Sequence, residues 1–499
     1  MTEPVPSVVV SLPARTVAEA RQQIRDARAA GADLAELRID RFSEEERAVI
    51  GTLFPSPLPL VATVRSRSEG GEGPDDPDVR AKLLSQLSRH PFRWIDVEAT
   101  ADLPAADSLA LPGVRDLIVS THLPDGADVA EWTKRFREAA PPGSVRKVVG
   151  RSAIGALLQS ILPQLPPPGD RRLVALSTGP SGPLFRAWSR RLGFPLVFAS
   201  LPDVEIPSER PPVEASQIPV DRLKPFLVAE GSPPLFAIAG HPVAHSRSPA
   251  VHHHWMEQDR HTGLFVPLDF ESDTEFTEAL PHLWERGFRG LSVTHPLKAV
   301  AFEVADRTSP GAEACGVANT LTFGPEGIEA ENTDLAAVLR RLGELRRDGR
   351  WDGGAVGVIG AGGAARATLA ALRSLGAETH VWSRRPEAAE RLAEEFGAHV
   401  ARGTESSRPL LVIHATPVGR EALGAAPPPE LGWLRSGGHL LDWVYLPSDP
   451  VIRTAAERAG ATYEDGSRLL VYQAATSYGL WWGTEPTEAQ VDSALGKVR

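Results

Sequence analysis

Polar side chains suited to covalent and proton-transfer chemistry stand at the ends of apolar segments in the first half of the chain. Glu36 and Arg38 lie two apart in AELRID, so both should point to the same side of one strand. Lys147 lies within VRKVVG, and His122 ends DLIVSTH. A lysine amine can add to a ketone to form an imine, and a histidine can remove the proton that the imine acidifies. Further candidates at segment ends are Arg65, Glu69 and Arg186, the last expected to open a helix.

Imine formation requires an uncharged amine. The apolar neighbours of Lys147 and several arginines, with Arg146 adjacent in sequence, should favour that form. A lysine in an apolar strand is also common at a sheet edge or a barrel mouth without any chemical role. The surrounding histidine and arginines favour the chemical interpretation.

Residues 355–372, AVGVIGAGGAARATLAAL, read as an apolar strand, a glycine-rich turn and a helix of small residues. Glycines permit the sharp turn and let a phosphate approach the backbone, where the free N–H groups of the helix start bind anions. A tight turn without a ligand is the alternative. The next strand, ETHVW, ends in Ser383, Arg384 and Arg385. Guanidinium groups without a carboxylate suit a 2′-phosphate, which indicates NADP unless the arginines are only solvated surface. The expected cofactor contacts are Gly360, Ala361, Gly362, Gly363, Ala364, Ala365, Ser383, Arg384, Arg385, Thr416, Val444 and Gly466.

A third group of polar residues lies between these two regions. Ser246 and Ser248 precede a helix in HPVAHSRSPAV, where hydroxyls either cap the helix or bind a carboxylate. Thr294 and Lys298 lie in SVTHPLK, with Lys298 in the first turn of a helix. Asn319 in GVANTL and Asp334 in ENTD follow.

The elements that must position these residues alternate between strands and helices. Eight apolar segments within residues 7–228, with helical stretches between most of them, predict an N-terminal (β/α)8 barrel; a doubly wound open sheet is the alternative. In a barrel, residues at the carboxyl ends of the strands form the active site. The link after the fourth strand, ADLPAADSLALPG, reads poorly as a helix. The predicted domains are 1–228 (barrel), 229–234 (linker), 235–334 (substrate-binding α/β domain), 335–465 (NADP-binding Rossmann domain) and 466–499 (helical return to the substrate domain).

Composition limits the class of protein. A chain of 499 residues should form two or three domains, and its net charge of −11 argues against nucleic-acid binding. It has no apolar run long enough for a membrane span and no recognisable targeting segment. Cys315 is the only cysteine, which excludes an intrachain disulfide and a cysteine zinc site. His252, His253 and His254 face different ways on a helix, so we expect a mixed surface and interface patch and no metal. A cytoplasmic enzyme with small-molecule substrates is expected, in an oligomeric state that the sequence leaves open.

The motifs ELRID, VRSRSEGG, VSTH, RKVVG and EASQIP, in this order, make residues 7–227 resemble type I 3-dehydroquinate dehydratase. The resemblance implies that Lys147 forms the imine, that His122 moves the proton and that Glu69 orients His122. The substrate-binding residues that it implies are Glu36, Arg38, Arg65, Arg186 and Gln217. One departure is Val213, where that family usually has a serine; Ser208 or Ser216 could replace the contact. Another is Arg146, where an apolar residue or proline usually precedes the lysine.

The motifs AHSRSP, SVTHPLK, VANT, ENTD, GAGGAARA, ATPVG, DWVY and LLVYQA make residues 235–499 resemble shikimate dehydrogenase. The resemblance implies Lys298 and Asp334 as the catalytic pair, with hydride passing from the nicotinamide to a ring ketone. It implies that Ser246 and Ser248 bind the substrate carboxylate and that the hydroxyls are bound by Thr294, Asn319, Tyr445 and Gln473. The departures from that family are Ser292 and His414 in place of asparagine, and Leu335 and Ala337 in place of glycine.

Together the two resemblances imply a bifunctional enzyme of the shikimate pathway, which leads through chorismate to the aromatic amino acids. It would dehydrate 3-dehydroquinate to 3-dehydroshikimate and reduce that product to shikimate with NADPH. One alternative is a shikimate or quinate dehydrogenase with a non-catalytic barrel. A regulatory protein that senses NADP and a shikimate-like acid is the other, against which Lys298 and Asp334 argue.

Overall fold

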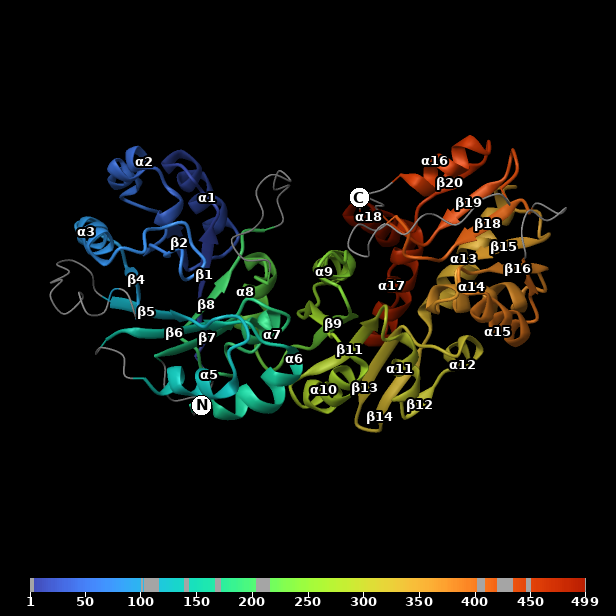
Figure 1. Cartoon of the computed structure of the whole chain (residues 1–499), viewed down its shortest axis with the longest axis horizontal. Helices are drawn as coiled ribbons and strands as arrows, with labels where there is room; N and C mark the ends of the chain where they lie inside the picture. Colours follow the sequence, from blue (N-terminus) through green and yellow to red (C-terminus); the bar gives the residue numbers. More distant parts are fainter. Residues whose placement is uncertain are drawn as a thin grey trace. The chain divides into compact units, whose positions relative to one another are not determined.

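The computed structural model describes residues 4–99, 102, 116–138, 143–166, 172–202, 216–401, 409–419, 434–445 and 450–498 (Figure 1). The chain divides into two compact units, Met1–Pro233 and Pro234–Arg499. The division falls within residues 229–234, the segment that the sequence suggests as a linker. The finer domain boundaries remain a prediction, and the two units are described separately below.

The first unit is built on one sheet of eight parallel strands in the order β7-β6-β5-β4-β3-β2-β1-β8. Because β8 pairs with β1, the sheet curls into a nearly closed barrel, and no β7–β8 ladder joins the described parts of those strands. This arrangement confirms the predicted (β/α)8 barrel and not its alternative, a doubly wound open sheet. The strands are β1 (Ser7–Leu12), β2 (Leu34–Arg38), β3 (Leu60–Thr63), β4 (Trp94–Glu98), β5 (Asp116–His122), β6 (Val145–Gly150), β7 (Leu173–Ser177) and β8 (Leu196–Ala199).

Helices cover the outside of this sheet (Figure 1). The helix α1 (Val17–Ala29) shows why: Thr16 caps its first turn, and Val17, Ala20, Ile24 and Ala27 form one buried face. Except for Asp102, the β4–β5 link that reads poorly as a helix lies outside the described residues. The other helical segments are η1 (Ile39–Arg41), α2 (Glu44–Ala48), η2 (Ile50–Leu53), α3 (Pro77–Leu87), α5 (Val129–Arg137), α6 (Ile154–Ala156), η3 (Leu157–Ile161), η4 (Leu162–Gln164), α7 (Gly182–Ala187) and α8 (Val220–Val228).

The second unit begins with a mixed six-stranded sheet in the order β10-β9-β11-β13-β14-β12. Its parallel core is β9 (Leu235–Gly240), β10 (Leu264–Asp269) and β11 (Phe288–Val293), to which the antiparallel pair β13 (Thr320–Gly324) and β14 (Gly327–Glu331) and the short β12 (Arg307–Thr308) are added. Its helices are α9 (Ser248–Asp259), α10 (Asp273–Glu285), α11 (Lys298–Glu303) and α12 (Pro310–Cys315).

A second six-stranded sheet, all parallel, follows in the order β17-β16-β15-β18-β19-β20. Numbered along the chain this is 3-2-1-4-5-6, the dinucleotide-binding arrangement. In this arrangement the strand order reverses between β15 and β18, and the cofactor crevice lies at the carboxyl ends of these two strands. The strands are β15 (Val356–Ile359), β16 (Thr379–Trp382), β17 (His399–Val400), β18 (Leu411–His414), β19 (His439–Asp442) and β20 (Thr462–Glu464); the helices are α13 (Thr333–Arg347), α14 (Gly363–Ser374), α15 (Pro386–Phe396) and α16 (Val451–Arg458).

The chain ends in α17 (Ser467–Trp482) and α18 (Glu488–Val498), which pack back onto α9 of the first of these two sheets (Figure 1). Trp481 stacks on Phe236 of β9 with ring centres 5.0 Å apart. In the described part of the chain, no helix combines the length and the apolar character that crossing a membrane requires.

The prediction that three consecutive histidines form a mixed surface and interface patch is wrong for His252. Its side chain is fully buried and stacks on Phe265 with ring centres 4.3 Å apart, because α17 and α18 cover that face of α9. Burial lowers the pKa of His252 to about 3. His253 and His254 do point elsewhere, to the carbonyl of Pro249 and the hydroxyl of Ser493.

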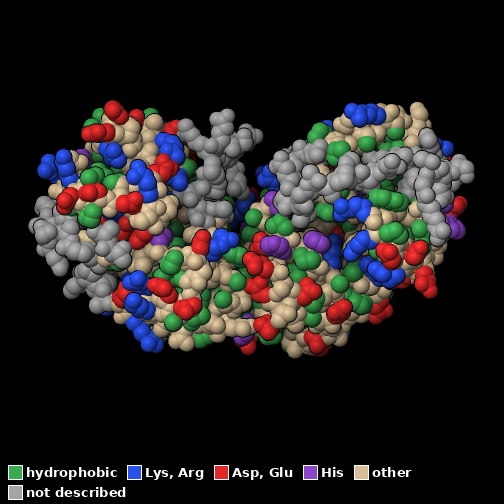
Figure 2. Space-filling model, in the orientation of Figure 1, with side chains coloured by type: hydrophobic (Ala, Val, Ile, Leu, Met, Phe, Trp, Pro, Cys, Tyr) green, Lys and Arg blue, Asp and Glu red, His purple; other side chains and the backbone are tan. Residues whose placement is uncertain are grey.

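Charged side chains of both signs are interspersed over the face of the molecule shown in Figure 2.

Two candidate active sites

A cavity of about 710 Å³ opens at the carboxyl ends of the barrel strands. All eight residues that the sequence suggests for this half line it, although they come from six different segments: Glu36, Arg38, Arg65, Glu69, His122, Lys147, Arg186 and Gln217.

Lys147 projects from β6 into this cavity beside two carboxylates. Its Nζ lies 3.0 Å from Asp96 Oδ2 and 3.9 Å from Glu36 Oε1. The expected cationic neighbours Arg38, Arg65 and Arg186 do line the cavity, but the two carboxylates beside the amine were not expected. Alternation along the strand sends Arg146 to the other side, where its guanidinium binds the carbonyl of Phe136.

Asp96 is a site residue that the sequence reasoning missed. Burial alone would raise its pKa, but the charges of Lys147 and Arg65 outweigh burial and hold the pKa well below its usual range. Asp96 is therefore a carboxylate that fixes the lysine. The available signal was the alternation Asp96, Glu98 in WIDVE, which places two acids on the inner face of β4.

His122 and Glu69 form a hydrogen-bonded pair at the mouth of the cavity, with Nδ1 and Oε2 2.7 Å apart. Burial and the charge of Arg65 lower the pKa of His122 well below its usual value, so the imidazole is neutral. Burial raises the pKa of Glu69 to about 7, against the opposing charge of Arg65 at 2.9 Å. A neutral imidazole whose orientation is set by a neighbouring acid can accept a proton from a substrate carbon.

Arg186 and Gln217 also line the cavity. The prediction that Arg186 opens α7 is wrong. Arg186 is the penultimate residue of this helix, because Pro183 starts the helix earlier. Its Nη1 donates to the carbonyls of Ser177 and Gly182 at 3.1 and 2.9 Å. Ser216 accepts a bond from Arg186, whereas Ser208 and Val213 lie outside the described residues. Gln217 donates to the hydroxyl of Ser11 at 3.1 Å, and its buried Oε1 has no hydrogen-bond partner among the described atoms.

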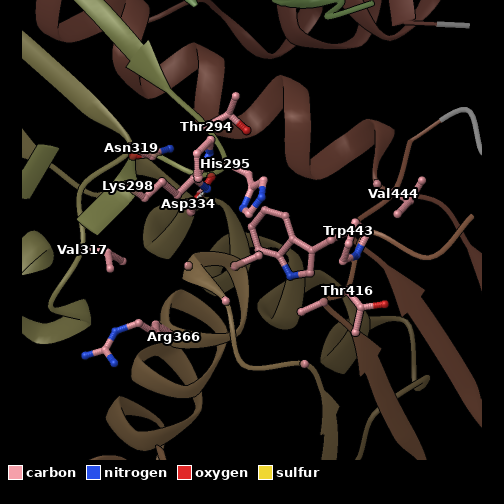
Figure 3. A pocket seen from close by; sticks show the side chains of 18 of the residues that line it. Thr294, His295, Lys298, Val317, Asn319, Asp334, Arg366, Thr416, Trp443 and Val444 are labelled. Atoms are coloured by element: carbon pink, nitrogen blue, oxygen red, sulfur yellow. Dashed lines mark hydrogen bonds and ion pairs between the residues drawn. The ribbon is translucent and has the colours of Figure 1, made fainter. Parts of the chain in front are cut away.

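The second unit holds a crevice of about 790 Å³ between its two sheets. Lys298, the first residue of α11, and Asp334, in the first turn of α13, form a hydrogen-bonded ion pair at its inner end. Figure 3 shows this pair beside Asn319 and Thr294, with Thr416, Trp443 and Val444 farther along the crevice.

Other predicted substrate contacts line the same crevice, namely Ser246, Ser248, Tyr445 and Gln473. Ser246 Oγ accepts from the backbone N–H of Ser248 at 3.2 Å, although Arg247 is the N-cap residue of α9. Carboxylate binding by the two serines stays a prediction. Asn319 is oriented by Thr333, whose N–H donates to Asn319 Oδ1 at 2.7 Å. Ser292 also lines the crevice, and its buried hydroxyl lacks a hydrogen-bond partner among the described atoms.

The glycine turn forms the floor of the other end. Gly360 has φ +134°, and a Cβ there would meet the Ala415 carbonyl oxygen at 2.4 Å, so only glycine fits. Gly362 caps α14, and a Cβ there would meet nothing within 4 Å. This open, side-chain-free approach to a helix start fits the phosphates of a dinucleotide. The exception among the twelve predicted cofactor residues is Ala365, which helix periodicity turns into the core. The other eleven line the crevice: Gly360, Ala361, Gly362, Gly363, Ala364, Ser383, Arg384, Arg385, Thr416, Val444 and Gly466.

A buried polar network supports the cofactor end, and the sequence reasoning missed two of its members, Asp442 and Tyr463. His414 Nδ1 lies 2.7 Å from Asp442 Oδ1, and its Nε2 lies 2.5 Å from Thr416 Oγ1. Asp442 also accepts from the Val444 N–H and the Tyr463 hydroxyl. These hydrogen bonds hold Thr416 and Val444 in fixed positions on the crevice wall.

Comparison with known proteins finds a match to a family model within each half of the chain. Residues 8–228 match type I 3-dehydroquinase, and residues 238–321 match the shikimate dehydrogenase substrate binding domain. The shikimate dehydrogenase (NADP(+)) of Acidiphilium cryptum is 38% identical over 275 residues, which cover 54% of this chain and 96% of that protein. The Thermus thermophilus enzyme of the same name is 37% identical over 267 residues, covering 53% of this chain and 98% of its own. A solved structure of the dehydroquinate dehydratase and shikimate dehydrogenase from S. pombe AroM covers 99% of this chain and 98% of its own at 22% identity, with a TM-score of 0.43.

Proposed function

The chain belongs to the shikimate dehydrogenase family, and from that membership and the barrel's match to type I 3-dehydroquinase we propose a fused enzyme with two consecutive activities. The barrel dehydrates 3-dehydroquinate to 3-dehydroshikimate. The second unit reduces 3-dehydroshikimate to shikimate with NADPH. The product of the first reaction is the substrate of the second, which gives a chemical reason for the fusion. A cytoplasmic location is part of the proposal.

The observation that carries the first activity is that Lys147 and His122 face one cavity, with Glu69 bonded to His122. Lys147 Nζ first releases a proton to solvent, and the uncharged amine then adds to the ketone carbon. Loss of water gives an iminium that acidifies the adjacent carbon. His122 takes a proton from that carbon and returns one to the departing hydroxyl, which leaves as water. Hydrolysis of the imine then releases the product and the lysine.

The remaining cavity residues divide between binding and positioning. Asp96 holds Lys147 on one side of the cavity, while Arg65 joins Asp96 at 3.0 Å and Glu69 at 2.9 Å. This network fixes the distance between the amine and the imidazole. Substrate hydroxyls and the carboxylate are left to the residues that line the free walls, namely Glu36, Arg38, Arg186 and Gln217.

The observation that carries the second activity is the ion pair of Lys298 with Asp334 at the inner end of the dinucleotide crevice. NADPH, when bound, supplies the hydride. Lys298 donates a proton to the ketone oxygen as negative charge develops there, and Asp334 keeps the lysine in place. Arg384 and Arg385 face the crevice after β16, where a 2′-phosphate would be held, and no carboxylate occupies residues 383–385.

Covalent trapping tests the dehydratase half of the proposal. Borohydride added to the protein with 3-dehydroquinate should reduce the imine and leave an adduct on Lys147, located by mass spectrometry of the digested protein. An unmodified Lys147, with no 3-dehydroshikimate formed in the absence of NADPH, would reduce the barrel to a non-catalytic attachment. The dehydrogenase alone would then stand.

A further inference from the structure

The three glycines of the turn before α14 have different surroundings. A Cβ on Gly360 would meet backbone, the carbonyl oxygen of Ala415 at 2.4 Å. A Cβ on Gly362 would meet nothing within 4 Å and would project into the crevice. A Cβ on Gly363 would meet the stem of Lys298, with Cδ at 2.7 Å, Cβ at 3.5 Å and Cγ at 3.6 Å.

We infer that Gly363 is a positioning residue for Lys298. The absence of a side chain at Gly363 leaves room for the methylene stem of Lys298 to lie across the first turn of α14. In that path the stem brings Nζ to Asp334. The inference rests on the proposed function, since it treats Lys298 as the proton donor. Gly363 thereby joins the cofactor turn to the reacting end of the crevice.

The surrounding contacts prevent α14 from moving aside to relieve a clash. Arg366, one turn along α14, donates from Nε to the Cys315 carbonyl at 2.6 Å, and it forms an ion pair with Glu395. Figure 3 shows Arg366 projecting from α14 away from Lys298. Gly316 leaves room for this guanidinium, because a Cβ there would meet Arg366 Nη2 at 2.5 Å. The first turn of α14 is therefore fixed against residues 315–316, and the lysine stem is the part that yields.

Two neighbouring glycines should then affect different steps. Gly363→Ala displaces Lys298 from Asp334 and lowers kcat, while the phosphate-binding face of the turn is unchanged. Gly362→Ala places a methyl group where the phosphates approach the backbone, and so weakens NADPH binding. Neither residue has a φ in the left-handed region, so alanine fits the backbone at both positions.

The test measures kcat for 3-dehydroshikimate reduction and the Kd of NADPH by fluorescence titration. Loss of a charge-assisted contact predicts a fall in kcat of about tenfold or more for Gly363→Ala, with the Kd unchanged within about twofold. For Gly362→Ala the Kd should rise instead. Gly496→Ala, a helical glycine whose Cβ would meet nothing within 4 Å, controls for the glycine-to-alanine change itself and should leave both values unchanged. A normal kcat in Gly363→Ala, or a Kd raised as much as in Gly362→Ala, would overturn the inference.

A double-mutant cycle on the melting temperature, Tm, tests the inference independently of enzyme activity. Gly363→Ala should lower Tm in the wild-type background and should not lower it in Lys298→Ala, where the clashing stem is gone. Equal changes in both backgrounds contradict the contact. If the wild-type protein reduces no 3-dehydroshikimate, the proposed function fails, and the Tm cycle still decides whether Gly363 makes room for Lys298.

Discussion

Asp96 Oδ2 lies 3.0 Å from Lys147 Nζ at the centre of the barrel, although the two residues are 51 apart in the chain. Asp96 also accepts from Arg65 at 3.0 Å and from Ser120 at 2.5 Å. The amine proposed to form the imine is thus held by a carboxylate that belongs to a larger buried network.

Asp96→Asn should impair the dehydratase without affecting the dehydrogenase of the same protein. The amide cannot balance the charges of Lys147 and Arg65, and leaving a buried charge without its partner costs about 3–5 kcal/mol. We expect a lower Tm for the barrel and a loss of dehydratase kcat of at least about tenfold. Normal dehydratase kinetics in Asp96→Asn, with NADPH oxidation as the internal control, would show that Asp96 does not hold the lysine.

The dehydratase should lose activity as the pH falls below about 7. Burial raises the pKa of Glu69 to about 7, so below that pH a growing fraction of the side chain is the neutral acid and no longer the carboxylate that orients His122. Burial and Arg65 lower the pKa of His122, so the imidazole itself stays neutral through this range. In the wild type, kcat/KM should therefore fall as the pH drops below about 7, and this acidic limb of the profile should be missing in Glu69→Gln. The same limb in both proteins would assign it to another group.

The buried His252 should make stability depend on pH. Its pKa is lowered to about 3 in the folded state against 6.5 when unfolded. The unfolded chain therefore binds the extra proton first, and stability is lost as pH falls from about 6.5 toward 3. At pH 5 the loss is about 2 kcal/mol, since each pKa unit is worth about 1.4 kcal/mol.

His252→Phe removes the titrating group and keeps a ring to stack on Phe265. The unfolding free energy of the second unit should then fall less between pH 7 and pH 5 than in the wild type. His282→Gln, a half-exposed position on α10, is the matched control and should keep the wild-type slope. An unchanged slope in His252→Phe would mean that His252 is hydrated or paired in solution.

The choice of cofactor should follow the end of β16. Ser383→Asp combined with Arg384→Ala removes a cation and adds a carboxylate where the second strand meets the crevice. A charge-assisted hydrogen bond is worth about 1.5–3 kcal/mol, so NADPH affinity should fall about tenfold or more, while NADH binding improves. Titration with both cofactors checks this. An unchanged preference would place the 2′-phosphate elsewhere.

The sequence predicted the barrel because eight apolar segments at regular spacing allow few other arrangements, and it predicted the crevice because a glycine turn has few uses between a strand and a helix. It failed where the outcome depends on which strands become neighbours. Arginines near Lys147 in sequence suggested cationic surroundings, whereas register placed Asp96 beside the amine and alternation turned Arg146 away. The burial of His252 was equally hidden, since the helices that cover it come from the far end of the chain. The link among His414, Asp442 and Thr416 likewise depends on the pairing of β18 with β19.

The central claim is that one chain performs both reactions in sequence. The most direct measurement supplies the purified protein with 3-dehydroquinate and NADPH and follows the products by NMR and the cofactor by absorbance. We predict shikimate and one NADPH oxidised for each 3-dehydroquinate consumed. Lys298→Ala should stop at 3-dehydroshikimate, and Lys147→Ala should consume no 3-dehydroquinate yet still reduce added 3-dehydroshikimate. If the wild-type protein leaves 3-dehydroquinate unchanged but reduces 3-dehydroshikimate, the claim of two linked activities is contradicted.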